Sequence, residues 1–188
     1  MKTTLNHITT IQTGLFAKPV SKGEIVYLQV KHFDENGQLN SVLHPDLLPD
    51  NSTQRHLLKS GDVLFAAKGT KNFAALYENK NLPAVASTSF FVIRLQETFQ
   101  NKLMPQFLVW FLSHPTTQSH LKGEAQATNI ASISKAVLSN LEISIPPLTT
   151  QTSILKIARL LIEEKKLAQE IDALRDKQIQ QQIINAIK

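Results

Sequence analysis

The carboxyl-terminal part of this sequence contains a run from residue 150 to residue 187 without a single glycine or proline. These two residue types are the ones that most often break a helix. An uninterrupted α-helix over this run would be roughly 55 to 60 Å long, at about 1.5 Å per residue. Just before it, Pro146 and Pro147 lack backbone donors and are expected to end a strand, after which Thr149 or Thr150 can cap the helix.

Apolar residues of this run recur with the spacing of heptad a and d positions, which predicts a coiled coil. They are Ile157, Leu160, Leu167, Ile171 and Leu174. Glu164 fills one position of the seam, and beyond Gln178 the apolar stripe drifts to Ile179, Ile183 and Ile187. We expect the seam to pair with another chain. The drift indicates a second partner surface or a bundle, and the alternative is a helix folded back along its own domain.

The rest of the chain is long enough for one hydrophobic core. We therefore expect a domain over residues 1–147 and a long helix over residues 148–188. Basic residues outnumber acidic ones by 13 to 10 through Ile145 and by 7 to 5 beyond it. Because both parts are mildly basic, the charge permits a polyanionic partner without requiring one.

Composition also limits the compartment and the chemistry. The chain has no cysteine, which excludes disulfides, thiol catalysis and cysteine-based zinc sites and agrees with a reducing cytoplasm. The first residues interrupt their apolar positions with Asn6, His7 and Gln12, which is untypical of a signal peptide. No apolar run approaches the roughly 18 residues of a membrane span. We expect a cytoplasmic protein without a membrane contact.

Several segments of the first domain carry strand signals. Residues 24–33 alternate Val26, Leu28 and Val30 with polar or aromatic positions, which predicts a strand with one face on the core, followed by a turn at residues 34–37. Strands are also expected at residues 63–67, 87–95 and 141–145. The continuous apolar run in residues 90–93 is typical of a central strand covered on both faces.

Helical periodicity appears later in the domain. Residues 104–112 place apolar side chains along one helical face, with Pro105 in the first turn, and Pro115 begins a second short helix. Residues 44–60 are expected to form a loop with a short helical turn, and residues 123–132 another loop. Ser134 is expected to cap a further turn. The predicted fold class is α/β (α+β), a mixed-sheet domain followed by one long coiled-coil helix.

Catalytic motifs are incomplete in this sequence. Asp50 and Lys68 have the spacing of a nuclease centre, but Ala66 replaces its second acidic residue, so the carboxylate pair that would hold Mg²⁺ is missing. Pro146 and Pro147 lack the polar and aromatic neighbours of an amino-methyltransferase motif. The histidines show no metal-ligand spacing, and no glycine-rich cofactor loop follows a first strand. We expect no catalytic residue, no metal ligand and no cofactor, and hence a protein that is not an enzyme.

The order of motifs is distinctive: IQTG, then GDVLFAAKGT, ASTSFFVIRL, FLVWFL and SISKAVLSNLEISIPPL, and finally a long helix that follows Gln151. This order resembles the target recognition domain and spacer helix of the DNA specificity subunit of type I restriction-modification systems. The resemblance covers nearly the whole chain. Its most specific parts are residues 61–64, Ser87 with residues 90–93, and residues 141–151.

That family's full-length subunit has two recognition domains spaced by two antiparallel helices, each domain reading half of a split target. This chain has one recognition domain and one helix, so the resemblance implies a half-size subunit that pairs as a homodimer on double-stranded DNA. It also implies a DNA methyltransferase subunit, with or without a restriction subunit, as the catalytic partner. A stiff helix pair suits this task, because half-sites on one face of DNA lie about 34 Å apart.

Three groups of side chains are candidates for contacting DNA, because lysine suits phosphates and asparagine can pair with adenine. The first is a loop with Lys68, Thr70, Lys71 and Asn72, the second contains Lys31, His32, Asn36 and Gln38, and the third is Thr128 and Asn129. For the first group, a solvated hairpin loop is the competing interpretation.

Two questions about function stay open at this level. The chain is a DNA-recognition subunit, or it is a noncatalytic coiled-coil adaptor or assembly protein whose domain binds protein, or a competitor of a specificity subunit. As a recognition subunit, it works as a homodimer or together with a larger specificity subunit.

Overall fold

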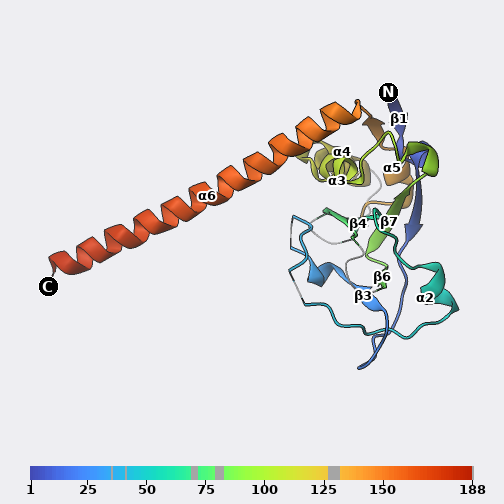
Figure 1. Cartoon of the computed structure of the whole chain (residues 1–188), viewed down its shortest axis with the longest axis horizontal. Coiled ribbons are helices and arrows are strands. Elements are labelled where there is room, and N and C mark those ends of the chain that lie inside the picture. The colour runs from blue at the N-terminus through green and yellow to red at the C-terminus, as the bar shows by residue number, and fades with distance from the viewer. Residues whose placement is uncertain (35, 41, 69–71, 79–82, 127–131, 188) are drawn as a thin grey trace. The chain divides into compact units, whose positions relative to one another are not determined.

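The computed structural model describes the chain except for residues 35, 41, 69–71, 79–82, 127–131 and 188. It divides into two compact units, Met1–Leu148 and Thr149–Lys188. The first unit contains the described strands and several short helices, and the second is helical throughout (Figure 1). We call them the recognition unit and the helical unit.

The main sheet of the recognition unit has four strands in the order β2-β7-β4-β5, and every neighbouring pair is antiparallel. The strands are β2 (Thr9–Thr13), β4 (Val63–Ala66), β5 (Ala74–Leu76) and β7 (Phe90–Leu95). Strand β7 lies inside the sheet and buries Phe90, Val92 and Ile93, which confirms the predicted central strand. It begins later than predicted, because residues 87–90 form a turn in which the Ser87 carbonyl accepts from the Phe90 N–H at 2.9 Å.

Two strand pairs complete the recognition unit. Strand β1 (Lys2–Thr4) is antiparallel to β8 (Glu142–Ser144), and β3 (Val26–Leu28) is parallel to β6 (Ala84–Ala86). The Met1 amino group donates to the Ile145 carbonyl at 3.1 Å, and the Ile145 N–H donates to the Met1 carbonyl at 2.7 Å. The first and last strands of this unit therefore lie side by side.

The strand predicted over residues 24–33 is much shorter than its alternating pattern suggests. Strand β3 ends at Leu28, and the 3-10 helix η1 (Val30–His32) follows. Tyr27 is as buried as its neighbours, because Val26 and Leu28 pack into one apolar cluster while Tyr27 packs into a second cluster with Leu47 and Val85. The one-sided strand is therefore wrong, since the β3-β6 pair lies between two apolar layers.

The short helices include the predicted ones. Helix α2 (Asn51–Arg55) is the expected turn in the long loop, and Asp50 caps it by accepting from the Thr53 N–H at 2.6 Å. Helix α3 (Pro105–Ser113) has Pro105 in its first turn and packs against β4 and β5. Ser134 caps α5 (Lys135–Asn140). Three of the short helices were not predicted, namely α1 (Leu5–Ile8), η1 and the 3-10 helix η2 (Glu97–Phe99).

Helix α4 (Pro115–Gln126) is longer than predicted. The loop expected from residue 123 is wrong over residues 123–126, which continue the helix. Gly123 disfavours a helix, but Glu124, Ala125 and Gln126 are good helix formers. Helical propensity in these three residues therefore outweighs the glycine.

The helical unit is formed by α6 (Leu148–Ala186), which is 39 residues long. The helix begins directly after Pro147, so Thr149 and Thr150 lie in its first turn, and the prediction that one of them caps it is wrong. Every residue from 159 to 187 is exposed. The mixed α/β domain and the long carboxyl-terminal helix confirm the predicted fold class. Among the described residues, no helix combines the length and the apolar character needed to cross a membrane.

Candidate nucleic-acid interface

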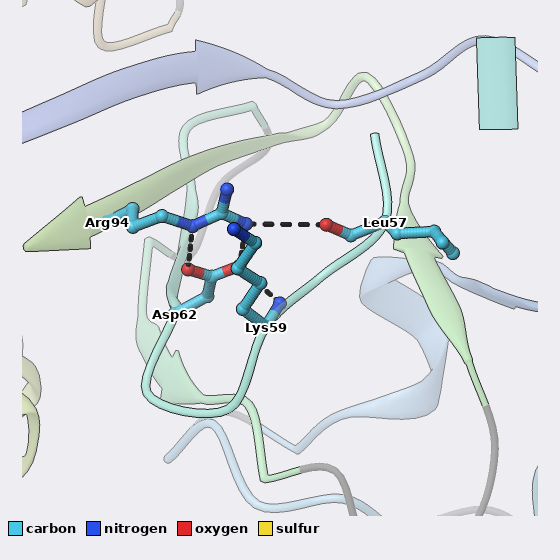
Figure 2. A network of polar contacts seen from close by, with 4 residues as sticks. All are labelled: Leu57, Lys59, Asp62 and Arg94. Atoms are coloured by element: carbon cyan, nitrogen blue, oxygen red, sulfur yellow. Dashed lines mark hydrogen bonds and ion pairs between the residues drawn. The ribbon is translucent and has the colours of Figure 1, made fainter. Parts of the chain in front are cut away.

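A buried ion pair organises the recognition unit beside the main sheet. The Asp62 side chain is 1% exposed, and its two carboxylate oxygens accept from Arg94 Nε at 2.7 Å and Arg94 Nη2 at 2.6 Å (Figure 2). The Lys59 N–H also donates to Asp62, and Arg94 Nη2 donates to the Leu57 carbonyl at 3.3 Å. The hydrogen bonds and charge of Asp62 raise the pKa of Arg94.

This ion pair explains two of the sequence motifs. Gly61 has a φ of 91°, which a residue with a side chain rarely adopts, and it turns the chain so that Asp62 points inward at the start of β4. Arg94 is the charged residue within the apolar run of β7. Because each charge satisfies the other, the pair acts as scaffold and we assign it no DNA contact.

The second candidate group is held by a compact turn. Asp34 Oδ1 accepts from the backbone N–H groups of Asn36 at 2.9 Å and Gln38 at 2.8 Å, and Gly37 supplies the left-handed residue with a φ of 75°. A Cβ on Gly37 would meet the Ala74 carbonyl oxygen at 2.4 Å, so this turn packs closely on β5. The exposed Asn36 and Gln38 side chains are thus presented beside the β4-β5 hairpin.

Lys31 and His32 lie in the 3-10 helix just before this turn. Lys31 is exposed, and His32 is half-buried and accepts from the Gln29 N–H through Nδ1 at 3.2 Å. Burial lowers the pKa of His32, the Lys31 charge lowers it further, and Asp46 opposes both. His32 is therefore uncharged at neutral pH and is suited to a hydrogen bond rather than to pairing with a phosphate.

Lys68, the first residue of the first candidate group, lies beside the described segment that starts at Ser132. Lys68 is exposed and pairs in an isolated bridge with Ser132, and the Ile133 N–H donates to the Ala67 carbonyl at 3.1 Å. The segment that follows Thr128 and Asn129 thus runs beside Lys68. Thr70, Lys71, Thr128 and Asn129 themselves lie outside the described residues.

Asn72 has a structural contact in this hairpin. Its Nδ2 donates to the Ala66 carbonyl at 2.8 Å, which ties the two ends of the connection together. One of its two amide donors is therefore already used, and the second donor and Oδ1 are what Asn72 retains for a contact with adenine.

A groove of 440 Å³ lies between the turn, β5 and α3. Its polar lining includes Asn36, Gln38, Glu78 and Gln106, above an apolar floor with Leu64. The amides of Asn36, Gln38 and Gln106 carry both donors and acceptors, which is the chemistry that base edges require. Gln106 was not predicted, although it is the one polar residue between Pro105 and Leu112.

Within the described residues, the turn with Asn36 and Gln38 packs on β5 through Gly37, and Lys68, just after β4, lies beside Ser132. Within the described part of the chain, no three histidine, aspartate or glutamate side chains are arranged to hold a metal ion. The described polar side chains around the hairpin and its groove are amides, lysine, histidine and the carboxylate of Glu78, and together they offer hydrogen-bond donors and acceptors.

The family comparison matches residues 16–173 to the type I restriction-modification DNA specificity domain. Comparison with curated proteins found no match. Among solved structures, the chain is similar to the HsdS subunit from Thermoanaerobacter tengcongensis, with a TM-score of 0.70 and 20% identity, covering 94% of this chain and 45% of that one. It is also similar to the type I restriction-modification S subunit from M. genitalium, with a TM-score of 0.58 and 16% identity over 94% and 44% of the two chains.

A third similar structure comes from work on complex assembly and conformational transition of the type I R-M system, with a TM-score of 0.62 and 17% identity over 87% of this chain and 38% of that one. The chain therefore spans less than half the length of the solved chains it matches. The family match extends over most of the sequence. This chain belongs to the family of type I restriction-modification DNA specificity domains.

Proposed function

We propose that this chain is a half-size DNA specificity subunit. Two copies pair through α6, each recognition unit reads one half of a split DNA site, and the pair directs a methyltransferase subunit to that site. Methylation, and cleavage where a restriction subunit takes part, are carried out by these partners in the cytoplasm.

The arrangement of the loops supports DNA reading. The exposed side chains of Asn36 and Gln38 line the groove. Exposed Lys31 lies in η1 just before their turn, and exposed Lys68 follows β4 in the hairpin connection. The lysines suit phosphates and the amides suit base edges, so one surface offers both positioning and readout. Thr70, Lys71, Asn72, Thr128 and Asn129 belong to the same proposed surface.

The observation that carries the pairing is the apolar seam of α6. Its residues Ile157, Leu160, Leu167, Ile171 and Leu174 are between 49% and 64% exposed. Exposed apolar residues at heptad spacing mark a surface that pairs with another helix. Two paired copies would together present two recognition units and two long helices, the set that the resemblance implies for a full-length subunit.

Reconstitution with the methyltransferase subunit of the same system tests this function. We expect methylation of genomic DNA only when both chains are present, at a two-part site whose halves are symmetric, as read by sequencing of modified bases. Methylation that is unchanged when this chain is omitted contradicts the proposal. If this chain instead suppresses the methylation that a full-length specificity subunit directs, and no new site is methylated, the chain is a competitor of that subunit.

A further inference from the structure

The connection between β2 and β3 carries an exposed aromatic residue next to two lysines. Residues 16–23 read FAKPVSKG, and we call this segment the basic loop. It contains Lys18 and Lys22, both exposed, and no acidic residue. Phe16 is 75% exposed, the largest exposure of any aromatic side chain among the exposed large hydrophobic residues of the described chain.

Hydrogen bonds hold the basic loop at both ends. Before it, the Leu15 N–H donates to the Ala86 carbonyl at 2.8 Å, and the Tyr27 hydroxyl donates to the Leu15 carbonyl at 2.9 Å. Further along, the Val20 N–H donates to the Asp46 carbonyl at 2.7 Å, and the Gly23 N–H donates to the Pro45 carbonyl at 3.1 Å. The loop is therefore anchored to the second apolar cluster at several points.

This anchoring is what keeps Phe16 outside the core. Leu15 and Ala17 pack against the cluster formed by Ile25, Tyr27, Leu47 and Val85, whereas the side chain of Phe16 between them is exposed. A phenylalanine held in water forfeits the free energy that burial in the core would provide. The fold thus presents an aromatic ring and does not merely fail to bury it.

We propose that the basic loop is a further contact with double-stranded DNA. Lys18 and Lys22 neutralise backbone phosphates, and Phe16 rests as an apolar wedge against a base step in the minor groove. Two lysines that closely follow an apolar side chain match the two needs of such a contact, charge for the backbone and a wedge for the bases. The inference rests on the proposed function, since it adds a contact to the same DNA-reading unit.

The charges near the loop favour DNA over a protein partner. Between Thr13 and Gly23 both formal charges are positive. Asp46, at the base of the loop, has one carboxylate oxygen occupied by the Tyr27 N–H at 2.8 Å, and Glu24 lies beyond the loop. The loop itself therefore offers a polyanion two positive charges and no carboxylate.

Salt dependence of binding tests the lysines. The full chain is titrated into a labelled mixed-sequence duplex of about 40 base pairs, which exceeds two half-sites one helical turn apart. Each phosphate contact adds about 0.9 to the slope of log affinity against log salt. We expect the double variant Lys18→Gln/Lys22→Gln to lower that slope by about 1.8. The matched control Lys122→Gln/Lys135→Gln loses the same charge from exposed positions in α4 and α5 and should keep the slope.

Phe16 is tested separately, because its loss should change affinity without changing the salt slope. We expect Phe16→Ala to weaken duplex binding about tenfold, Phe16→Leu to restore most of it, and thermal unfolding to be unchanged in both. A duplex with 2-aminopurine should become brighter on binding of the wild type and of Phe16→Leu, since the wedge unstacks a base step.

Two outcomes overturn the inference. If the wild type binds the duplex and the loop variants bind it with the same affinity and salt slope, the basic loop is not part of the DNA contact. If the loop variants keep DNA binding but no longer bind the methyltransferase subunit, the loop is a contact for that protein. If the wild-type chain binds no duplex, alone or with the methyltransferase subunit, the proposed function itself fails first.

Discussion

Asp62 has the least exposed charged side chain of the ion pairs found in the described residues, and its removal leaves Arg94 without its partner. Breaking a buried pair on one side costs about 3 to 5 kcal/mol. Arg94 is 32% exposed, so water compensates part of the loss. We expect Asp62→Ala to lower the free energy of unfolding by about 2 to 3 kcal/mol in urea titration.

The matched control for this variant is Glu142→Ala. Glu142 pairs with Lys2, and both side chains are more than half exposed. Such a surface pair contributes about 0 to 1 kcal/mol. An equal loss in both variants would show that Asp62 has no special structural role.

His32 predicts a pH dependence of stability. Its pKa in the folded chain is lower than the ordinary value of 6.5, mainly through burial, so the unfolded chain takes up this proton first as the pH falls. The wild type should therefore lose stability from about pH 6.5 down to the folded-state pKa, relative to His32→Gln. Urea midpoints measured between pH 7.5 and about 5 give the comparison, with the exposed His44→Gln as control. Parallel curves for wild type and His32→Gln contradict this assignment.

At this scale the sequence identified side-chain types better than it identified their surroundings. Lysines and amides in turns are recognisable because turn residues are exposed. The bond from Asn72 to Ala66 and the burial of His32 depend on segments that are not adjacent along the sequence, so no local pattern reports them. Asp62 and Arg94 are 32 residues apart, and their pairing is visible only once β4 and β7 are neighbours.

Among the elements, α6 carries the sharpest prediction. If the seam pairs two chains, the triple variant Leu167→Glu, Ile171→Glu and Leu174→Glu should yield monomers in light scattering, because six added charges would face one another across the pair. Circular dichroism should show that the recognition unit stays folded.

A second triple variant separates the seam from the helix as a whole. Ile162→Glu, Gln169→Glu and Ala173→Glu add the same charges at exposed positions outside the seam. This variant should keep the mass of the wild type. Dimers in both variants would mean that the chains pair through a surface other than the seam. Monomers in both would mean that pairing does not depend on the seam in particular.

Elements with strong local signals were predicted, and elements defined by distant partners were not. Helices α3 and α6 were predictable from the periodicity of their apolar residues and from the positions of prolines. Strands β1 and β6 are three residues long and are paired with β8 and β3 from far along the chain, so their short sequences carry little signal. Strand β3 is likewise shorter than its alternating sequence suggests, because its length depends on the distant three-residue strand β6 with which it pairs.

For the whole molecule, the proposed pairing makes helix length a measure of target spacing. Duplicating residues 165–171 adds one heptad, keeps the seam in register and lengthens α6 by about 10 Å. We expect the gap between the two half-sites to grow by roughly three base pairs, at about 3.4 Å per pair. Sequencing of modified bases in cells that also contain the methyltransferase subunit would report the new gap.

An insertion of three residues at the same place is the control, since it breaks the heptad register. It should abolish pairing and methylation together. A heptad insertion that leaves the gap unchanged would mean that α6 does not set the distance between half-sites.

The pairing of β1 with β8 places the entry and the exit of the recognition unit next to each other, with Met1 bonded to Ile145. A module whose two ends meet can be cut out and replaced by another of different internal sequence without moving what it is attached to. Under the proposed function, exchange of residues 2–144 between related chains would change the DNA target in one recombination event and would leave α6 and its proposed partners unchanged. The β1-β8 strand pair therefore holds together the two ends of a segment that could be exchanged as one unit.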